Sequence, residues 1–327
     1  MKNVNAKNII VVGASAGGLS AVSRLLSKFN IEMDVSVFVV IHVSRYSSVD
    51  IILNHIQRQT KLKCKIPEDG EYIESKTVYF PKADHHIMIE KDRVFLQKGA
   101  YENHWRPSID VLFRSAAAAY DSCVTGIILT GLLDDGTSGM YAIKRCGGTC
   151  IVQDPEEAEF ADMPKSVIRN MEVDYQFSVD EMGDFISQHY SDKECVPGIV
   201  PEEVKYEAEI AKRIISTPKE LQQLGDFTPF TCPDCGGSMV KVNGDVVGRY
   251  RCYTGHTFTE RSLVNEQVKR IEESLWVAIR MMEERRNLLI TLSGDDDEDN
   301  KKDSRANQLE THVERLKNMM KTIGHNA

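Results

Sequence analysis

A serine stands in a glycine-rich turn near the start of the chain. Residues 13–18 read Gly-Ala-Ser-Ala-Gly-Gly and directly follow an apolar run at 8–12. Gly-x-Ser-x-Gly is the order of a nucleophile elbow, in which small neighbours let the chain turn sharply and expose the serine hydroxyl. A helix after the turn would direct its N-terminal N–H groups toward an oxyanion formed there. The turn therefore makes Ser15 a candidate nucleophile.

A serine needs an imidazole to accept its proton and a carboxylate to orient that imidazole. His42 follows the apolar run 35–41, and Asp135 lies in the turn after the apolar run 124–130. In a doubly wound sheet the carboxyl ends of neighbouring strands lie on one edge. We expect Ser15, His42 and Asp135 to meet there as nucleophile, base and orienting acid.

The same turn has a second interpretation, because dinucleotide pyrophosphates also bind between a first strand and a first helix. The dinucleotide pattern is G-x-G-x-x-G, but Ser15 occupies its middle glycine position. The second strand ends at His42, where a ribose-binding acid would be expected. Both departures favour hydrolysis, and a nicotinamide- or flavin-dependent oxidoreductase remains the alternative that cofactor titration tests.

Four potential metal ligands cluster in the C-terminal part. Cys232 and Cys235 form a Cys-x-x-Cys pair, and His256 follows Cys252 by four residues. Three thiolates and an imidazole fill a tetrahedral zinc shell and leave no position for water, so we predict structural zinc and no cofactor for catalysis. The alternative is reduced, metal-free cysteine. The scattered cysteines are predicted to be reduced thiols: Cys64, Cys123, Cys146, Cys150 and Cys195.

Strands and helices alternate through the part of the chain that carries the serine. The predicted strands are 8–12, 35–41, 76–80, 124–130 and 149–152, the predicted helices are 17–29, 49–60, 109–120 and 137–144, and a β-hairpin or edge strands are expected within 71–98. This alternation predicts an α/β fold with a doubly wound, mainly parallel sheet.

The chain divides into four predicted segments. They are a catalytic domain at 1–190, a linker at 191–226 with a short helix around 202–214, a zinc-ribbon-like module at 227–259, and a helical hairpin or coiled coil at 260–327. In the last segment apolar residues recur every three or four positions, as on an amphipathic helix. That stripe is either an internal packing surface or a surface for self-association or partner docking. The acidic run 295–299 is predicted to be a solvated loop.

Net charge and the length of the apolar runs argue against two classes of partner, nucleic acids and membranes. The 327 residues carry a net charge of −9, which argues against nucleic acid as the main partner. No apolar run approaches the roughly 20 residues of a membrane-spanning helix, and the first five residues do not resemble a secretory signal. A cytoplasmic protein without membrane insertion is the expectation.

Across nearly all of residues 8–190 the chain resembles the catalytic domain of the chemotaxis receptor methylesterase (CheB) family. The matching stretches are 12–18, 40–42, 106–113, 129–131, 135–136, 139–140, 153–154 and 163–164. The resemblance implies hydrolysis of glutamate methyl esters on chemoreceptors or related sensory proteins, often accompanied by glutamine deamidation. It implies the roles given above for Ser15, His42 and Asp135, and it makes the backbone amides of Ala16 and Leu132 the oxyanion donors.

The resemblance also carries weaker expectations. Leu132 stands where the family has methionine, a change that a backbone role tolerates. Residues 84–86 (Asp84, His85 and His86) and Arg106 match segments that surround the substrate cleft. The chain starts within a few residues of the catalytic strand, so the receiver domain of many members is expected to be absent, which leaves the mode of regulation open. A non-catalytic module that recognises receptor helices in the same cleft is the alternative function, and the intact Ser-His-Asp set argues against it.

Overall fold

The computed structural model describes residues 8–190, 195–196, 198–213, 215–292 and 299–323. The interpretations of the first five residues and of the acidic run at 295–298 lie outside these residues. The contacts divide the chain into two units, 1–260 and 261–327, and each is described by itself. Among the described helices, none combines the length and the apolar character needed to cross a membrane.

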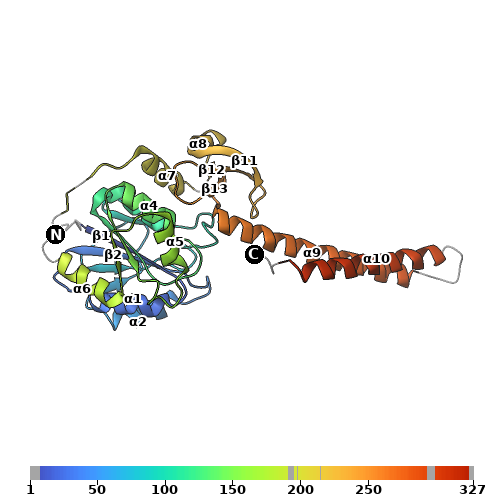
Figure 1. The fold of residues 1–327 in the computed structure, drawn as a ribbon, viewed down its shortest axis with the longest axis horizontal. Coiled ribbons are helices and arrows are strands. Elements are labelled where there is room, and N and C mark those ends of the chain that lie inside the picture. Colours follow the sequence, from blue (N-terminus) through green and yellow to red (C-terminus); the bar gives the residue numbers. More distant parts are fainter. Residues whose placement is uncertain (1–7, 191–194, 197, 214, 293–298, 324–327) are drawn as a thin grey trace. The chain divides into compact units, whose positions relative to one another are not determined.

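Seven parallel strands form the central sheet of the first unit (Figure 1). In spatial order they are β10 (Tyr175–Phe177), β9 (Thr149–Gln153), β8 (Val124–Ile128), β1 (Asn8–Ala14), β2 (Val35–Ile41), β5 (Thr77–Tyr79) and β3 (Lys63–Lys65). All residues of β1, β2 and β8 are buried, as the continuous apolar runs predict for a sheet covered on both faces. β1 pairs with β2 on one side and with β8 on the other, so the carboxyl ends of these three strands meet at a topological switch point.

Helices cover both faces of this sheet, as Figure 1 shows. One face is packed by α1 (Gly18–Ser27), α2 (Val49–Gln57) and α6 (Val179–His189), and the other by α3 (Ile109–Tyr120), α4 (Thr137–Arg145) and α5 (Asp162–Asn170). The predicted α/β fold with a mainly parallel sheet is confirmed. The strands β3 and β10 were not predicted, because three residues are too few to show a periodicity.

A small antiparallel sheet accounts for the irregular stretch after β5. It consists of β4 (Glu71–Tyr72), β7 (Arg93–Gln97) and β6 (His86–Glu90), in that spatial order. The β6–β7 pair is the β-hairpin expected within 71–98. The chain then returns through a loop to the N-terminus of α3, and this loop lies next to the catalytic candidates.

After residue 190 the first unit continues with two helices and a second antiparallel sheet. The helices are α7 (Glu202–Lys212) and α8 (Pro218–Leu224), and the strands, in spatial order, are β11 (Gly225–Thr231), β12 (Ser238–Val242), β13 (Arg249–Cys252) and β14 (Thr257–Thr259). We call residues 225–259 the Cys/His module. The module belongs to the same compact unit as the central sheet.

The second unit is helical. It contains α9 (Glu260–Thr291), apart from that helix's first residue, and α10 (Asp299–Met320). Two ion pairs, Glu283–Lys317 and Arg286–Glu310, join the two helices. The residue numbers rise along α9 as they fall along α10, so the two helices run antiparallel. Large apolar side chains of α9 are exposed: Val264, Ile271, Trp276, Val277, Met281, Leu288 and Ile290. Their use as a docking surface stays a prediction.

One expectation about the cysteines is wrong. Cys123 and Cys195 were predicted to be reduced thiols, but they form a disulfide whose Cα atoms lie 5.4 Å apart. Seventy-two residues separate them in sequence, and the chain folds back past α6 to bring them together. Cys64, Cys146 and Cys150 are buried thiols, as predicted.

Candidate active site

The turn that carries Ser15 is fixed by backbone contacts between β1 and the end of β8. The Ser15 N–H donates to the carbonyl oxygen of Thr130 at 3.0 Å. Gly17 has φ +73°, the left-handed conformation that favours glycine, and it precedes α1. A Cβ on Gly131 would lie 2.8 Å from the Ser15 Cβ, so the two turns approach as closely as they do only because residue 131 is glycine. Ser15 is left partly exposed.

His42 lies beside Asp135, as predicted from the sheet edge. The His42 Nε2 atom is 2.8 Å from Asp135 Oδ2, and both side chains are almost fully buried. The Nδ1 atom of His42 has no hydrogen-bond partner among the described residues. Because a neutral imidazole that donates through Nε2 has a lone pair on Nδ1, Nδ1 is the atom able to accept a proton. Ser15 and His42 line one cleft of about 600 Å³.

Asp135 accepts four more hydrogen bonds, which hold it as an anion. The donors are Ser108 Oγ at 2.9 Å, Ile109 N at 2.8 Å, Asp110 N at 3.3 Å and Asn103 Nδ2 at 3.1 Å. Two of them are backbone amides at the start of α3, where the helix dipole also favours negative charge. Burial acts to raise the pKa of Asp135, but the hydrogen bond and charge of His42, with the amide donors, keep the pKa below its usual value.

A second buried carboxylate, Asp110, supports the first. Its Oδ1 atom accepts the N–H groups of Gly136 at 3.0 Å and Gly139 at 2.6 Å, at the start of α4. Its Oδ2 atom accepts from Asn103 at 2.9 Å. Burial, together with the charge of Asp135, raises the pKa of Asp110 well above its usual value. Asp110 thereby ties the first turns of α3 and α4 together around Asp135.

The predicted oxyanion donors lie in the two turns that converge on Ser15. Ala16 follows the serine directly, and Leu132 follows Gly131, where its side chain is 47% exposed. Within the described part of the chain, neither backbone N–H donates a hydrogen bond to another group. Both N–H groups are therefore available to a ligand.

The residues matched to the surroundings of the cleft separate into two groups. The Arg106 guanidinium donates to Asp84 Oδ1 from Nε at 2.9 Å and from Nη2 at 2.6 Å, and both residues line a small cavity that shares Ile41 with the cleft. His86 is buried instead. Its Nε2 lies 2.9 Å from the Ala100 carbonyl oxygen, and its Nδ1 accepts the N–H of Ser108. The expectation that His86 lines the cleft is wrong. At the start of β6 its side chain instead contacts Ala100 and Ser108, the residue before α3.

Sequence reasoning missed four residues of the site: Asn103, Trp105, Ser108 and Asp110. The Trp105 ring stacks on the His42 ring with centroids 4.1 Å apart and planes 8° apart. Ser108 and Asp110 carried a usable signal, since a serine before a helix and an acid in its first turn are typical of helix N-termini. Asn103 and Trp105 carried none, because only the fold of the 101–105 loop brings them to the site.

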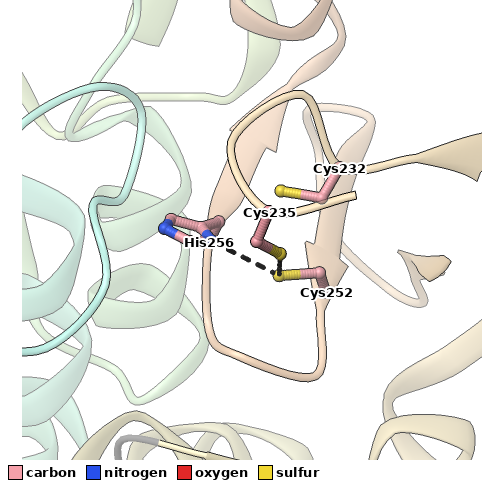
Figure 2. A group of neighbouring side chains, drawn as sticks. All are labelled: Cys232, Cys235, Cys252 and His256. Carbon is pink, nitrogen blue, oxygen red and sulfur yellow. Dashed lines mark hydrogen bonds between the residues drawn. The ribbon is translucent and has the colours of Figure 1, made fainter. Parts of the chain in front are cut away.

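The four predicted metal ligands converge in the Cys/His module, as Figure 2 shows. Their donor atoms all lie within 4.8 Å of one another. Cys235 Sγ is 3.7 Å from Cys252 Sγ, which is 3.6 Å from His256 Nδ1. Bond lengths of about 2.3 Å to sulfur and 2.0–2.1 Å to nitrogen require separations of about 3.8 and 3.6 Å in a tetrahedron. The donor set therefore fits zinc.

A buried ion network docks the module on the domain that holds the central sheet. Arg249 of β13 is 1% exposed and pairs with Asp245 at 2.8 Å, with Glu207 of α7, and with Glu102 at 3.4 Å. Glu102 also pairs with Arg114 of α3. Burial opposes the charge on Arg249, but the carboxylates of Glu207, Asp245 and Glu102 raise its pKa above the usual value.

Comparison with known proteins matches the part of the chain that holds the serine. A family model described as CheB methylesterase matches residues 10–186. A Leptospira interrogans protein named putative protein-glutamate methylesterase/protein-glutamine glutaminase is 37% identical over 176 residues, which cover 54% of this chain and 91% of that protein. A Methanosarcina mazei protein-glutamate methylesterase/protein-glutamine glutaminase is 30% identical over 57% of this chain, which spans about half (52%) of that relative.

A solved structure agrees with these matches. The crystal structure of the Thermotoga maritima CheB methylesterase catalytic domain aligns with a TM-score of 0.53 and 29% sequence identity, over 56% of this chain and 98% of that one. The match by the family model ends at residue 186, so it does not include the Cys/His module.

Proposed function

The chain belongs to the CheB methylesterase family, and from that premise we propose that it is a protein-glutamate methylesterase that works as a serine hydrolase. The observation that carries the proposal is the state of His42. Its Nε2 is held by a buried, ionised Asp135, its Nδ1 is left without a partner among the described residues, and it shares a cleft with Ser15. A general base for a serine needs an imidazole that a carboxylate orients through one ring nitrogen while the other nitrogen can accept the hydroxyl proton, and these observations support that role for His42.

The proposed reaction is acyl transfer in two steps. Ser15 Oγ attacks the ester carbonyl carbon while His42 Nδ1 takes the hydroxyl proton, and the carbonyl electron pair moves onto oxygen. The amides of Ala16 and Leu132 hold that oxyanion. When the intermediate collapses, the methoxy group leaves with the proton from His42 as methanol, and the glutamyl group stays on Ser15. Water then repeats the sequence and releases a glutamate side chain.

We propose glutamate methyl esters on chemoreceptors or related sensory proteins as the substrates. The support is the printed name of the relatives, which also includes protein-glutamine glutaminase. Deamidation uses the same acyl-enzyme, because attack on a glutamine side chain expels ammonia in place of methanol. The two activities therefore require no difference in the Ser-His-Asp set.

The first test measures methanol release from receptor preparations methylated at glutamate. Ser15→Ala is expected to lower kcat on the order of 10⁶-fold, as removal of a triad serine does elsewhere. Ser274→Ala, which changes an exposed serine of α9, is the matched control and keeps full activity. Methanol release that survives in Ser15→Ala contradicts the proposed nucleophile, and no release by the unmutated protein contradicts the substrate class.

We also propose that the Cys/His module holds one structural zinc ion through Cys232, Cys235, Cys252 and His256. A bound zinc ion would crosslink the turn after β11 to the turn between β13 and β14. Metal analysis should give one zinc per chain, and chelation should lower the thermal unfolding midpoint. Cys235→Ser should lose the zinc, whereas Cys64→Ser, at a buried thiol of β3, should keep it. A full chain that purifies without zinc and takes none up contradicts this site.

A further inference from the structure

One amide side chain joins the two buried carboxylates of the active site. Asn103 Nδ2 lies 2.9 Å from Asp110 Oδ2 and 3.1 Å from Asp135 Oδ1. An amide nitrogen carries two hydrogens, so each carboxylate receives one. Since Asp135 orients His42, Asn103 acts on the base through a single intermediate residue.

The side-chain oxygen and the backbone N–H of Asn103 are bound by the Cys/His module. Its Oδ1 atom accepts the backbone N–H of Thr259 at 3.2 Å, and its own N–H donates to the carbonyl oxygen of Thr257 at 2.8 Å. The Thr257 N–H in turn donates to the carbonyl oxygen of Tyr101 at 3.3 Å. Strand β14 therefore lies against the 101–105 loop and fixes both the backbone and the side chain of Asn103.

The predicted metal ligands bracket the turn that leads into β14. Cys252 ends β13, and His256 directly precedes Thr257. The Cys252 N–H donates to the His256 carbonyl oxygen at 3.0 Å, which closes the turn between the two ligands. A group that holds both ligands in place therefore also sets the position of β14.

The 101–105 loop needs this support because of its backbone conformation. Asn103 has φ +52° and His104 has φ +69°, two consecutive residues with side chains in the left-handed region. Such conformations persist only where the surroundings impose them. The His104 ring contacts Phe258 of β14 edge-on at 5.5 Å, and the next residue, Trp105, stacks on His42. Loss of β14 would free the loop, and with it two contacts of the catalytic pair.

We propose that the metal-holding Cys/His module is a positioning element of the esterase site and acts through Asn103. The inference rests on the proposed function for the identity of the substrate. The test at Ser15 does not depend on that substrate. Asn103 is a positioning residue, since it touches Asp135 and no reacting atom. Asp135 keeps its other hydrogen-bond donors when the Asn103 side chain is removed, so activity should not vanish. We expect it to fall about 10- to 100-fold, as on removal of a residue that orients a functional group without touching the substrate.

The test uses the full, zinc-loaded chain and a fluorophosphonate probe, which phosphonylates a reactive serine with loss of fluoride and needs no receptor. Asn103→Ala is expected to keep one zinc per chain, to react at Ser15 about 10- to 100-fold more slowly, and to lower kcat for methanol release with little change in KM. The ¹H NMR resonance of the His42 Nε2–H proton should shift or broaden. Asn243→Ala, the same change at an exposed site in the module, should match the unmutated protein.

Metal removal supplies a measurement that does not depend on a substitution. Chelation of the unmutated protein should slow the reaction at Ser15 by a similar factor, and added zinc should restore it. Chelation of Asn103→Ala should slow it little further, because two changes that act through one contact are not additive.

Three results would overturn the inference. The first is Asn103→Ala reacting at the unmutated rate. The second is a chelated protein that has lost its zinc but reacts as before, which would mean that the Arg249 ion network alone holds β14. The third is full additivity of chelation and Asn103→Ala. If receptors release no methanol but the Ser15 results are as expected, the proposed substrate fails and the coupling stands.

Discussion

The orientation of the His42 ring determines which of its nitrogens would act as the base in the proposed reaction. Nε2 faces Asp135 and Nδ1 is left to accept a proton, whereas in the chymotrypsin triad Nδ1 faces the aspartate and Nε2 serves the serine. Both arrangements are chemically competent, because either nitrogen of a neutral imidazole can carry the hydrogen. The tautomer here is imposed by Asp135, whose five hydrogen-bond donors keep it an acceptor on both oxygens.

At the residue scale we predict that Asp135→Asn lowers kcat for methanol release about 10⁴-fold. An asparagine NH₂ group can donate to His42 Nε2, which would move the ring hydrogen to Nδ1 and block proton transfer from Ser15. Single-turnover kinetics at pH 7 with methylated receptor measure the effect. Asp184→Asn, at an exposed aspartate that pairs with Lys28, is the control. A loss below about 10-fold would mean that Asp135 does not set the tautomer.

At the scale of elements, the site depends on how helix starts and short strands are joined. The first turn of α3 supplies amides to Asp135 and, through Asp110, caps the first turn of α4. The Cys/His module is held against these helices by the Arg249 network and by the backbone pairing of β14 with the 101–105 loop. A buried ion pair costs desolvation, so removal of one partner destabilises more than the pair itself stabilises.

This network predicts a pH-dependent contribution to stability. Burial acts to raise the pKa of Asp245, but Arg249 and the Ser138 hydroxyl lower it below the usual value near 3.8. A carboxyl whose pKa is lower in the folded state stabilises the protein above its unfolded pKa, and that contribution is lost as pH falls through the folded value. Asp245→Asn should therefore lower the free energy of unfolding at pH 7 by about 3 kcal/mol. This is the low end of the range for breaking a buried ion pair, because Glu207 and Glu102 still face Arg249.

Urea unfolding at pH 7 and at several pH values below 4 measures this difference, which should shrink as pH falls through the folded pKa of Asp245, because the carboxyl then protonates in the unmutated protein as well. Glu74→Gln, which removes a surface pair with Lys63, should change the free energy of unfolding by no more than about 1 kcal/mol. A difference between Asp245→Asn and the unmutated protein that stays constant with pH would contradict the assigned charge interaction.

At the scale of the whole molecule, a disulfide adds to the apolar cores on the two sheet faces, and the proposed zinc site would add a second crosslink. The Cys123–Cys195 disulfide joins the 3₁₀ turn before β8 to the segment after α6 and closes a loop of 72 residues. Such a crosslink stabilises mainly by restricting the unfolded chain. The Cys/His cluster lies in the same unit and would close a second, shorter loop.

Reduction of this disulfide is predicted to lower the free energy of unfolding by about 4 kcal/mol, from the loop-closure entropy of a 72-residue loop. Urea unfolding with and without reductant measures the effect, with thiol counting to confirm reduction. The double variant Cys123→Ser/Cys195→Ser is the control, and its unfolding should not respond to reductant. Coincident curves for the oxidised and reduced forms of the unmutated protein would contradict the prediction.

The sequence by itself determined the central sheet and the placement of Ser15, His42 and Asp135 at one edge of it. Buried strands and amphipathic helices leave periodic patterns in short windows, and parallel strands place their carboxyl ends on one edge. Ser15, His42 and Asp135 each follow a predicted strand, so topology alone brought them together. The spacing of Cys232, Cys235, Cys252 and His256, from which a zinc site is predicted, is equally local in the sequence.

Only the tertiary structure decided how the Cys/His module meets the active site. The hydrogen bond between Asn103 and Thr259 joins residues 156 positions apart, and the ion pair between Glu102 and Arg249 joins residues 147 positions apart. The Cys123–Cys195 disulfide is a third case. Contacts of this kind depend on how separate elements pack, and no pattern within one element encodes them, because each residue alone fits an ordinary loop or strand.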